Sequence, residues 1–550
     1  MNDQTIFQTP SAYDFPLLIK QLLISPVANP GDGEIVYGDR VRHGYGTLFE
    51  RIGKLANVLD NLAVPADATV AVMDWDSHRY LEGYFAIPMT GRVLQTVNIR
   101  LSPDQIAYTL NHARAHTLVV HRDFLAIVEA IRDHLSSVEH IVLIDEERTP
   151  PDTPLAIAGE FERLIAGATA DYEFPDFDEQ RLATLFFTSG TTGHPKGVYY
   201  SHRQMTLHTL GTVAILGSAA SQGRFHRDDI YMPITPLFHA HAWGVPYAAT
   251  MMGVKQVYPG RYEPEILLRL IREEQVTFCH CVSTILQMLL EHPDSEITDF
   301  GNLKMLIGGG PLPQGLARAA LERGIDIFTG YGMSETGPVQ TINHLTRKEL
   351  HTDLDEQVRL RTRTGRPVFL CDVRTVDSQM NFLPRDGKTA GEVVFRSPWL
   401  TQGYHEDPGK SEELWRGGWL HSGDIGVFSP DGSLQITDRL KDVIKTGGEW
   451  VSSLELESLI SRHPGVAEVA VIGIPDDRWG ERPLALVVPG RTASPPTETD
   501  LKSHIQAYVD EGVIPGYAVP ESVRFVEALE KTSVGKLDKK RLRSRYGQGR

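Results

Sequence analysis

The sequence predicts an α/β protein with a large N-terminal domain and a small, mobile α+β C-terminal domain. Three observations support this fold class. The chain has 550 residues, enough for three or four folding units of about 150 residues each. Strands and helices alternate along the first part of the chain, and short strands between Gly, Pro and Asp turns follow. We therefore expect two doubly wound βαβ subdomains and a small β-barrel-like lobe within residues 1–438, and the C-terminal domain at 439–550.

The alternation is clearest between residues 69 and 145. Ser102, Pro103 and Gln105 have the pattern of a helix start, an N-cap serine followed by proline and then glutamine. The predicted strands are Thr69–Asp74, Val93–Asn98, Thr117–Val120 and His140–Asp145, and the predicted helices are Ser77–Met89, one opened by Ser102, and Asp123–Leu135. Such βαβ units form a mostly parallel sheet covered on both faces. The same alternation of strands and helices recurs at about 203–330.

The sequence pattern changes towards the C-terminus. Short strands at Cys371–Val376, Gly391–Arg396 and Leu434–Thr437 predict the antiparallel, barrel-like lobe, at about 340–438. An α+β stretch follows, with a helix at Ser453–Arg462 and strands at Val466–Ile474, Leu484–Pro489 and Ser522–Val526. The basic tail from Lys536 is expected to be solvated or loosely ordered, with Lys539, Lys540 and Arg541 as surface charge.

Composition excludes several classes of function. Lys and Arg number 54 against 71 Asp and Glu, a net charge of −17, which argues against a nucleic acid or an anionic membrane as the main partner. Three cysteines exclude a disulfide framework, and we expect Cys279 and Cys281 in the core. Met1–Leu17 has no secretory signal pattern, and no apolar run is long enough to span a membrane. We expect a cytoplasmic protein.

The most informative segment is Leu185–Ser201, LFFTSGTTGHPKGVYYS. An apolar strand leads directly into a run of Gly, Ser and Thr at 188–193, and Lys196 follows. Backbone N–H groups of such a loop can converge on an anion, and the lysine adds a positive charge. The run is not a Walker A motif, because the lysine comes three residues after Gly193, and no G-x-G-x-x-G motif indicates a nicotinamide cofactor. The segment predicts a loop that cradles a polyphosphate.

Two further segments suit a planar base and a metal ion. In Thr329–Pro338, TGYGMSETGP, Tyr331 lies between glycines and can lie flat against a base, and Glu335 suits a hard cation such as Mg²⁺. Gly308-Gly309-Gly310 follows an apolar run that resembles the end of a buried strand, where α/β sheets bind ligands. A tight turn is the alternative for these glycines.

These ordered motifs resemble the acyl-adenylate-forming enzymes, which include acyl-CoA synthetases, adenylation domains of peptide synthetases and beetle luciferases. The resemblance covers most of the chain up to Lys536. It implies ATP, Mg²⁺ and coenzyme A as cofactors or co-substrates, with Mg²⁺ held by Thr188 and Glu335. Ser334 stands where the family more often has threonine. The implied ATP and AMP contacts are Thr188, Ser189, Gly190, Thr191, Thr192, Gly193, Lys196, Gly309, Gly310, Tyr331, Gly332, Ser334, Glu335, Asp424, Arg439 and Lys536.

The resemblance also assigns roles near the C-terminus. Asp424, which ends WLHSGD, and Arg439 would bind the ribose, because a carboxylate accepts from both vicinal hydroxyls. Lys441 would be the hinge between the domains, and Gly447-Gly448-Glu449 would face CoA after the small domain turns. Lys536, in KTSVGK, matches the family's catalytic lysine. Its positive charge would offset the negative charges of the α-phosphate and the attacking carboxylate.

The segment Tyr231–Tyr247, YMPITPLFHAHAWGVPY, indicates which class of carboxylic acid the enzyme would bind. Relatives that activate amino acids have an aspartate after the phenylalanine, where this chain has His239, so a free amino acid is not favoured. The FHxxAW pattern resembles the fatty-acyl branch of medium- and long-chain ligases, with His239 near the carboxylate and Trp243 closing the acyl tunnel. The implied acyl pocket is His239, Trp243, Gly308 and Tyr331, with an ordinary core position as the alternative for Trp243. Medium or long, branched, alicyclic or thioether acids all remain open.

We therefore expect an ATP-dependent carboxylic acid–CoA ligase, with a fatty acid as the favoured substrate. One alternative is transfer of the acyl group to a separate carrier protein. The other is a nucleotide-binding protein without turnover, against which the presence of Glu335, Asp424, Arg439 and Lys536 argues. The expected partners are the small-molecule acid, ATP and CoA, with no nucleic acid and no integral membrane segment. A homodimer is left open.

Overall fold

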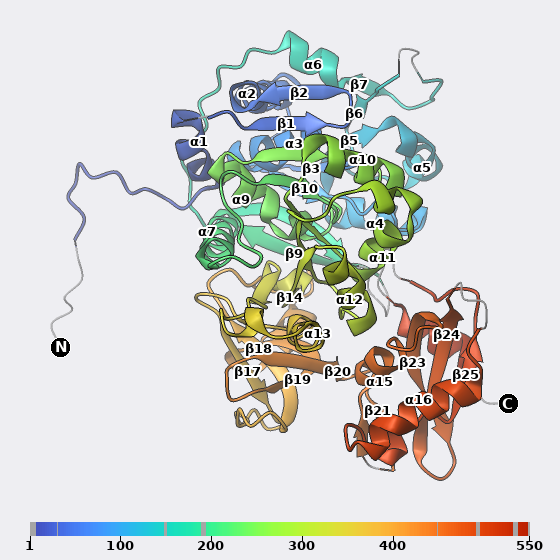
Figure 1. Ribbon diagram of the computed structural model, residues 1–550. Coiled ribbons are helices and arrows are strands. Elements are labelled where there is room, and N and C mark those ends of the chain that lie inside the picture. The colour runs from blue at the N-terminus through green and yellow to red at the C-terminus, as the bar shows by residue number, and fades with distance from the viewer. Residues whose placement is uncertain are drawn as a thin grey trace.

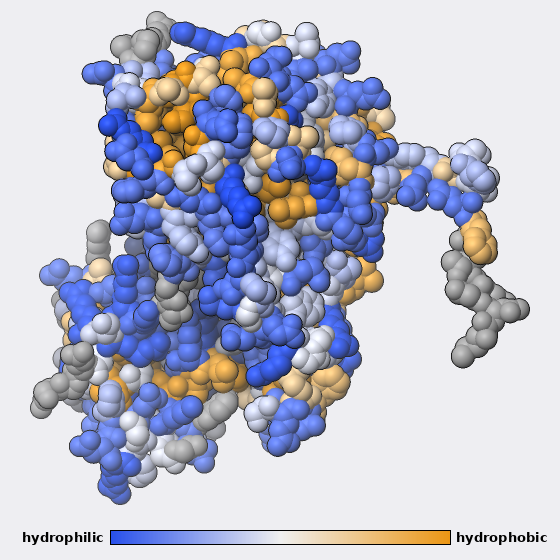
Figure 2. Space-filling model, turned by 180° about the vertical axis from the view of Figure 1, so that it is seen from behind, coloured by the Kyte–Doolittle hydropathy of each residue, from blue (hydrophilic) through white to orange (hydrophobic). Residues whose placement is uncertain are grey.

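The computed structural model describes residues 7–29, 31–147, 151–188, 194–447, 449–490, 495–531 and 537–547. An upper body of two sheets and their helices lies above a smaller β lobe and a separate C-terminal α+β unit (Figure 1). The predicted fold class is confirmed: a mixed α/β protein with a large N-terminal part and a small C-terminal part. Hydrophilic residues cover most of the face seen from behind (Figure 2). Among the described residues, no helix has the length and apolar character needed to cross a bilayer.

The first subdomain is a seven-stranded sheet with the order β7-β6-β5-β3-β4-β8-β9, parallel except for the β8–β9 pair. Its strands are β3 (Thr69–Met73), β4 (Val93–Thr96), β5 (Ala115–His121), β6 (His140–Ile144), β7 (Ile157–Glu160), β8 (Leu182–Thr188) and β9 (Lys196–Ser201). The associated helices are α3 (His78–Met89), α4 (Pro103–His112), α5 (Leu125–Ile131) and α6 (Phe161–Gly167). Ser102 and Gln105 form the predicted capping box at the start of α4.

The second subdomain is a nine-stranded sheet with the order β16-β15-β14-β13-β12-β10-β11-β1-β2. Its strands are β1 (Glu34–Tyr37), β2 (Val41–Gly44), β10 (Ile230–Pro233), β11 (Lys255–Tyr258), β12 (Phe278–Cys281), β13 (Lys304–Ile307), β14 (Asp326–Gly332), β15 (Val339–Ile342) and β16 (Arg366–Pro367). Cys279 and Cys281 are fully buried on β12, as expected of core residues. The helices of this region are α1 (Ile24–Ala28), α2 (Tyr45–Asn61), α7 (His202–Ser218), α8 (Ala240–Trp243), α9 (Val245–Met252), α10 (Pro264–Glu274), α11 (Ser283–Glu291), α12 (Gln314–Glu322) and α13 (Leu354–Arg361).

The two sheets share one apolar core. Residues of α3, α9 and β12, such as Phe85, Tyr247 and Phe278, belong to the same buried cluster. A second cluster covers the other face of the nine-stranded sheet with side chains of α10, α11 and α12, among them Leu267 and Leu286. The helices α3 and α9 therefore lie in the layer between the sheets, and both sheets are covered on both faces, as βαβ units require.

The β lobe is a four-stranded antiparallel sheet with the order β17-β18-β19-β20. Its strands are β17 (Asp372–Val376), β18 (Ala390–Arg396), β19 (Leu420–Phe428) and β20 (Leu434–Arg439), with α14 (Pro408–Leu414) between β18 and β19. Within the stretch expected to form the lobe, β15 and β16 instead extend the edge of the nine-stranded sheet. The lobe sheet proper thus begins at Asp372.

The C-terminal unit is built on a mostly antiparallel sheet with helices against it. Its elements are β21 (Ile444–Thr446), β22 (Glu449–Val451), β23 (Val466–Asp476), β24 (Gly480–Pro489), β25 (Ser522–Phe525), α15 (Ser453–Ile460), α16 (Glu498–Asp510) and α17 (Lys539–Tyr546). The expectation of a loosely ordered basic tail was wrong for its described part, 537–547, most of which is α17. Leu542 is buried against β23 and β24, and the Lys539 ammonium lies 2.7 Å from Glu457 Oε1.

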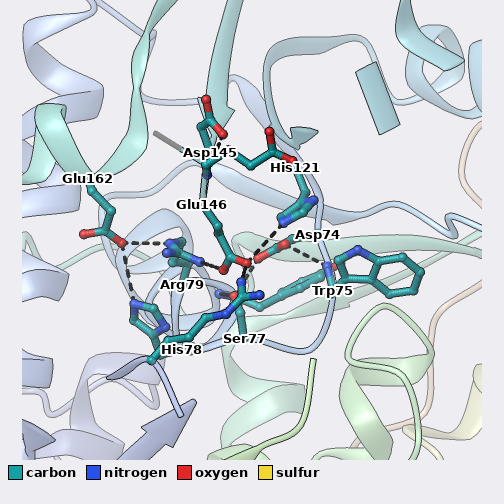
Figure 3. Close-up of polar contacts among 12 residues, drawn as sticks. Asp74, Trp75, Ser77, His78, Arg79, His121, Asp145, Glu146 and Glu162 are labelled. Carbon is teal, nitrogen blue, oxygen red and sulfur yellow. Dashed lines mark hydrogen bonds and ion pairs between the residues drawn. The ribbon is translucent and has the colours of Figure 1, made fainter. Parts of the chain in front are cut away.

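A network of buried charges joins elements of the upper body (Figure 3). Arg79, on α3, donates to Glu146 after β6 at 2.9 Å and to Glu162 on α6 at 2.7 Å. His78 Nε2 lies 3.5 Å from Glu162, and burial lowers the pKa of His78 to about 3. The imidazole is therefore neutral at ordinary pH, and the network connects the start of α3 with the segment after β6 and with α6.

Candidate active site

A cavity of about 1890 Å³ opens between the upper body, the β lobe and the C-terminal unit. It is lined by most of the predicted site residues that the structure describes: Thr188, Lys196, His239, Trp243, Gly308, Gly309, Gly310, Tyr331, Gly332, Ser334, Glu335, Asp424, Arg439 and Lys441. These residues come from segments that are far apart in the sequence, and the fold brings them to one place. Among the predicted residues, Ser189, Gly190, Thr191, Thr192, Gly193, Gly448 and Lys536 lie outside the described part of the chain.

The C-terminal unit presents one of its surfaces to the cavity. Leu537 and Asp538 line it, whereas Gly447 and Glu449 do not belong to the lining. Described residues that follow the KTSVGK segment in the chain therefore line the cavity, whereas the two described residues of the predicted CoA-facing turn do not.

Strand ends explain why the site forms where it does. Thr188 and Lys196 are opposite each other in the β8–β9 register, so they flank the segment predicted to cradle phosphates. Ile307 and Thr329 pair in parallel on β13 and β14, so Gly308, directly after β13, and Gly330, near the end of β14, reach the same edge. The carboxyl ends of parallel strands are where open α/β sheets bind ligands.

The Asp424 carboxylate interacts with two other residues of the cavity wall. Tyr331 Oη donates to Asp424 Oδ2 at 2.7 Å, and Arg439 Nε lies 3.3 Å from Oδ1. Asp424 and Arg439 are direct partners in the β19–β20 register, which places both on one side of that sheet. Burial and the neighbouring carboxylate raise the pKa of the Tyr331 phenol, so it remains a hydrogen-bond donor. The group combines a ring, a carboxylate and a cation at one wall of the cavity.

Glu335 is 7% exposed and is held by a residue that the sequence did not single out. Tyr404 Oη donates to Glu335 Oε1 at 2.8 Å, and the backbone N–H of Thr401 donates to the Glu335 carbonyl at 3.1 Å. The Lys196 ammonium lies 4.4 Å from the centroid of the Tyr404 ring. Tyr404 thus connects the lysine after the phosphate segment with the carboxylate predicted to bind metal. Tyr404 lies in a loop, where no periodic pattern marks it.

The donor set around Glu335 fits Mg²⁺. The described residues hold no group of three or more His, Cys, Asp or Glu side chains that could bind a metal by themselves. Mg²⁺ rarely needs such a group, because it is usually bound by one or two carboxylates together with substrate phosphates and water. Glu335 and Thr188 line the same cavity and could hold the ion in this way. When bound, it would neutralise phosphate charge.

The segment predicted to border the acid contains an unusual turn. Ala240, His241, Ala242 and Trp243 have φ between 45° and 59°, and Gly244 has φ of 74°. Trp243 is 6% exposed and packs against His280, with ring centroids 5.0 Å apart, while also lining the cavity. A Cβ at Gly308 would lie 3.0 Å from the Trp243 ring, so the bare glycine leaves room for the indole. Trp243 is therefore both a core residue and a wall of the cavity.

Contacts on both sides of Lys441 tie the C-terminal unit to the lobe. Asp438 Oδ2, at the end of β20, accepts from Ser453 N at 2.7 Å and from Ser453 Oγ at 2.6 Å. The Lys539 ammonium donates to Ser453 Oγ at 2.6 Å and pairs with Glu457. Lys539 is only 8% exposed, so the expectation of a surface charge was wrong for this residue. Partial burial and the nearby Arg439 lower the pKa of Lys441.

Comparison with known proteins agrees with this geometry. The chain matches the model of the AMP-binding enzyme family over residues 25–405 and that of the AMP-binding enzyme C-terminal domain over 455–536. It is 36% identical to a 3-methylmercaptopropionyl-CoA ligase of Ruegeria lacuscaerulensis, over 96% of this chain and 97% of that protein. It is 37% identical to a long-chain-fatty-acid–CoA ligase of Thermus thermophilus, over 92% and 91%.

A solved structure shows the same fold. The anthranilate CoA ligase AuaEII in complex with anthranoyl-AMP superposes with a TM-score of 0.84 at 25% identity, over 97% of this chain and 98% of that one. These relatives are named CoA ligases, and such AMP-binding ligases use ATP, Mg²⁺ and CoA, so the expected enzyme class and cofactors are confirmed. The chain belongs to the AMP-binding enzyme family, in its acyl-CoA synthetase branch.

Proposed function

We propose that this enzyme joins an apolar carboxylic acid, in the first place a fatty acid, to CoA through an acyl-adenylate. The observation that carries the proposal is that one cavity is lined both by Tyr331, Glu335 and Asp424 and by His239 and Trp243. The first group suits a nucleotide and its metal ion, and the second borders a space for the acid. The lining of the same cavity also includes the apolar side chains Val282, Leu290, Leu306, Leu312, Leu316 and Ala319.

In the first step a carboxylate oxygen of the acid bonds to the α-phosphorus of ATP, and the bond from that phosphorus to the pyrophosphate oxygen breaks. Acyl-AMP forms and pyrophosphate leaves. An ionised carboxylate is already a nucleophile, so this step needs no general base. We assign phosphate binding to the 188–196 segment and ribose binding to Asp424 and Arg439. We assign to the Lys536 ammonium the positive charge that offsets the carboxylate and the α-phosphate as they approach each other.

In the second step the CoA sulfur bonds to the acyl carbon, the acyl–phosphate bond breaks, and AMP leaves while the thiol proton passes to solvent. We place the domain boundary after Asp438 and the hinge at Lys441. Because Gly447 and Glu449 are not part of the cavity lining in this structure, the proposal has the C-terminal unit turn before CoA is captured.

The test is a panel of acids incubated with ATP, Mg²⁺ and CoA. It should include short, medium and long fatty acids, a thioether acid, an aromatic acid and free amino acids. Pyrophosphate release and thioester formation, read by mass spectrometry, are expected for apolar acids and not for amino acids. Pyrophosphate release with none of the acids would leave only nucleotide binding. Acyl-AMP formation without thioester, followed by transfer to a carrier protein, would replace CoA as the acceptor.

A further inference from the structure

The left-handed turn at 240–244 needs an external support. Left-handed backbone is disfavoured for residues with a Cβ, and runs of it persist only where the surroundings determine them. Four consecutive residues with side chains adopt it here, and the turn carries Trp243 into the cavity wall. The chain just before the turn is anchored through its backbone: Asp76 accepts from Leu237 N at 3.0 Å, and Thr96 donates to the Phe238 carbonyl at 2.9 Å.

Within the turn, the side chain of His241 reaches another element. Its Nε2 lies 2.7 Å from the hydroxyl of Thr184 on β8. That hydroxyl donates to the Leu94 carbonyl at 3.1 Å, so its oxygen accepts from His241 Nε2–H. The imidazole is buried among the rings of Tyr84, Phe186 and Tyr247. Burial lowers the pKa of His241 to about 3, so the neutral ring keeps this geometry at ordinary pH.

Strand β8 connects this contact with the phosphate side of the cavity. Thr184, Phe186 and Thr188 alternate along β8 and therefore lie on the same face of the strand. Thr188 ends the strand and lines the cavity, next to the segment proposed to bind phosphates. One short rigid strand thus carries both the support of the acid-side turn and the first residue of the phosphate side.

We propose that the hydrogen bond from His241 to Thr184 is a specificity-determining contact that sets the position of Trp243, and hence the shape of the acid space, relative to the phosphate site. The inference rests on the proposed acid-ligase function. His241 is a positioning residue, because it acts through the turn and lies behind the cavity wall. Loss of the bond should allow the turn to shift and should change which acids are accepted, while the ATP site stays in place.

Thr184→Val tests the contact, since it keeps the shape of the side chain and removes the hydroxyl. We expect KM for the best acid to rise about tenfold, the size of one lost buried hydrogen bond, and the order of preference among acids to change. KM for ATP should stay within about twofold. Thr184→Ser keeps the hydroxyl and should retain the wild-type profile. Trp243→Ala is the comparison that shows what a shifted profile looks like.

Thr212→Val is the matched control. Thr212 is also buried, and its hydroxyl has no hydrogen-bond partner among the described residues, so this variant makes the same chemical change without removing a hydrogen bond and should keep the wild-type acid profile. A double-mutant cycle of Thr184→Val with His241→Leu should show non-additive changes in acid preference, because both variants remove the same bond.

The outcomes separate the two proposals. If the wild-type enzyme turns over none of the acids, both the proposed function and the specificity role of this contact are wrong. Turnover by the wild type, with an acid profile in Thr184→Val that is as unchanged as in Thr212→Val, overturns the specificity role and leaves the proposed function standing.

Discussion

The Tyr331 hydroxyl and the Asp424 carboxylate form a 2.7 Å hydrogen bond at one wall of the cavity, between β14 and β19. The bond joins the nine-stranded sheet to the lobe, and Arg439 approaches the same carboxylate from β20. A ligand that binds Asp424 must therefore meet a carboxylate already oriented by two donors. This preorganisation is expected for a group that recognises vicinal hydroxyls.

Asp424→Asn should weaken ATP binding more than acid binding. The amide cannot accept from two hydroxyls as a carboxylate does, so we expect KM for ATP to rise about tenfold, with KM for the acid nearly unchanged. Steady-state kinetics with each substrate varied in turn would check this. Asp372→Asn, at an exposed ion pair with Arg374 in the same lobe, is the control. Equal effects on both substrates would contradict the ribose assignment.

Glu335→Gln should slow adenylation about a hundredfold at low Mg²⁺, since loss of a charged group at a reacting phosphate costs about 3 kcal/mol. Tyr404→Phe removes the hydroxyl that orients Glu335 and should raise the Mg²⁺ concentration needed for half-maximal rate by about threefold, with a smaller loss at saturation. The measurement is pyrophosphate release against Mg²⁺ concentration. Glu139→Gln, on the exposed surface, should match wild type. Wild-type turnover by Glu335→Gln at every Mg²⁺ level would remove the metal assignment.

The two lysines should affect different half-reactions. Lys536→Ala should slow pyrophosphate release about a hundredfold and largely spare thioester formation from synthetic acyl-AMP. Lys441→Pro should do the opposite, because proline fixes φ near −65° where the backbone has to turn. The half-reactions are measured separately, without CoA and from acyl-AMP. Equal losses in both variants would argue against alternation of the domain.

Ser453→Ala tests whether the present orientation serves adenylation. Ser453 and Asp438 lie on opposite sides of Lys441 in the chain, so rotation at the proposed hinge must break the bond between them. Removing the hydroxyl should favour the turned orientation, with adenylation slower by up to about tenfold and thioester formation from acyl-AMP undiminished. Ser503→Ala, on the exposed side of α16, is the control. Faster adenylation in Ser453→Ala would assign this orientation to the other half-reaction.

Acid should destabilise the fold because several histidines are buried in the neutral form. Burial lowers the pKa to about 3 for each of His78, His202, His208, His241 and His280. Below the unfolded-state pKa of about 6.5 the unfolded chain binds more protons, so stability falls with falling pH by about 1.4 kcal/mol per pH unit for each such histidine, down to about pH 3. Urea unfolding between pH 8 and 5 measures the slope.

One variant measures the contribution of a single histidine, His202, to the pH dependence of the unfolding free energy. His202 Nδ1 accepts from the Ile19 N–H at 3.3 Å, and an asparagine can supply an acceptor in its place. His202→Asn should therefore flatten the slope by about one proton. His351→Asn, at an exposed position, should leave the slope unchanged. A pH-independent unfolding free energy in the wild type would show that the folded and unfolded states bind equal numbers of protons, and would contradict burial of neutral rings.

Much of the fold was determined by local patterns. Each predicted strand between residues 69 and 145 exists with bounds close to those expected, because strand alternation and caps such as Ser102 act within a few neighbouring residues. Tyr331, Glu335 and Asp424 could likewise be selected from the sequence, since their segments combine glycines with groups suited to nucleotides, and the resemblance supplied their order.

Only the tertiary structure decided which groups hold these residues in place. Tyr404 bonds to Glu335 from 69 residues away, and His241 bonds to Thr184 across 57 residues, distances over which sequence periodicity carries no information. The left-handed turn at 240–244 and the burial of Lys539 against Glu457 also depend on packing that competes with local preference. Local propensity acts through neighbouring residues, whereas orientation of a site depends on long-range contacts that form only when the sheets, the lobe and the C-terminal unit meet.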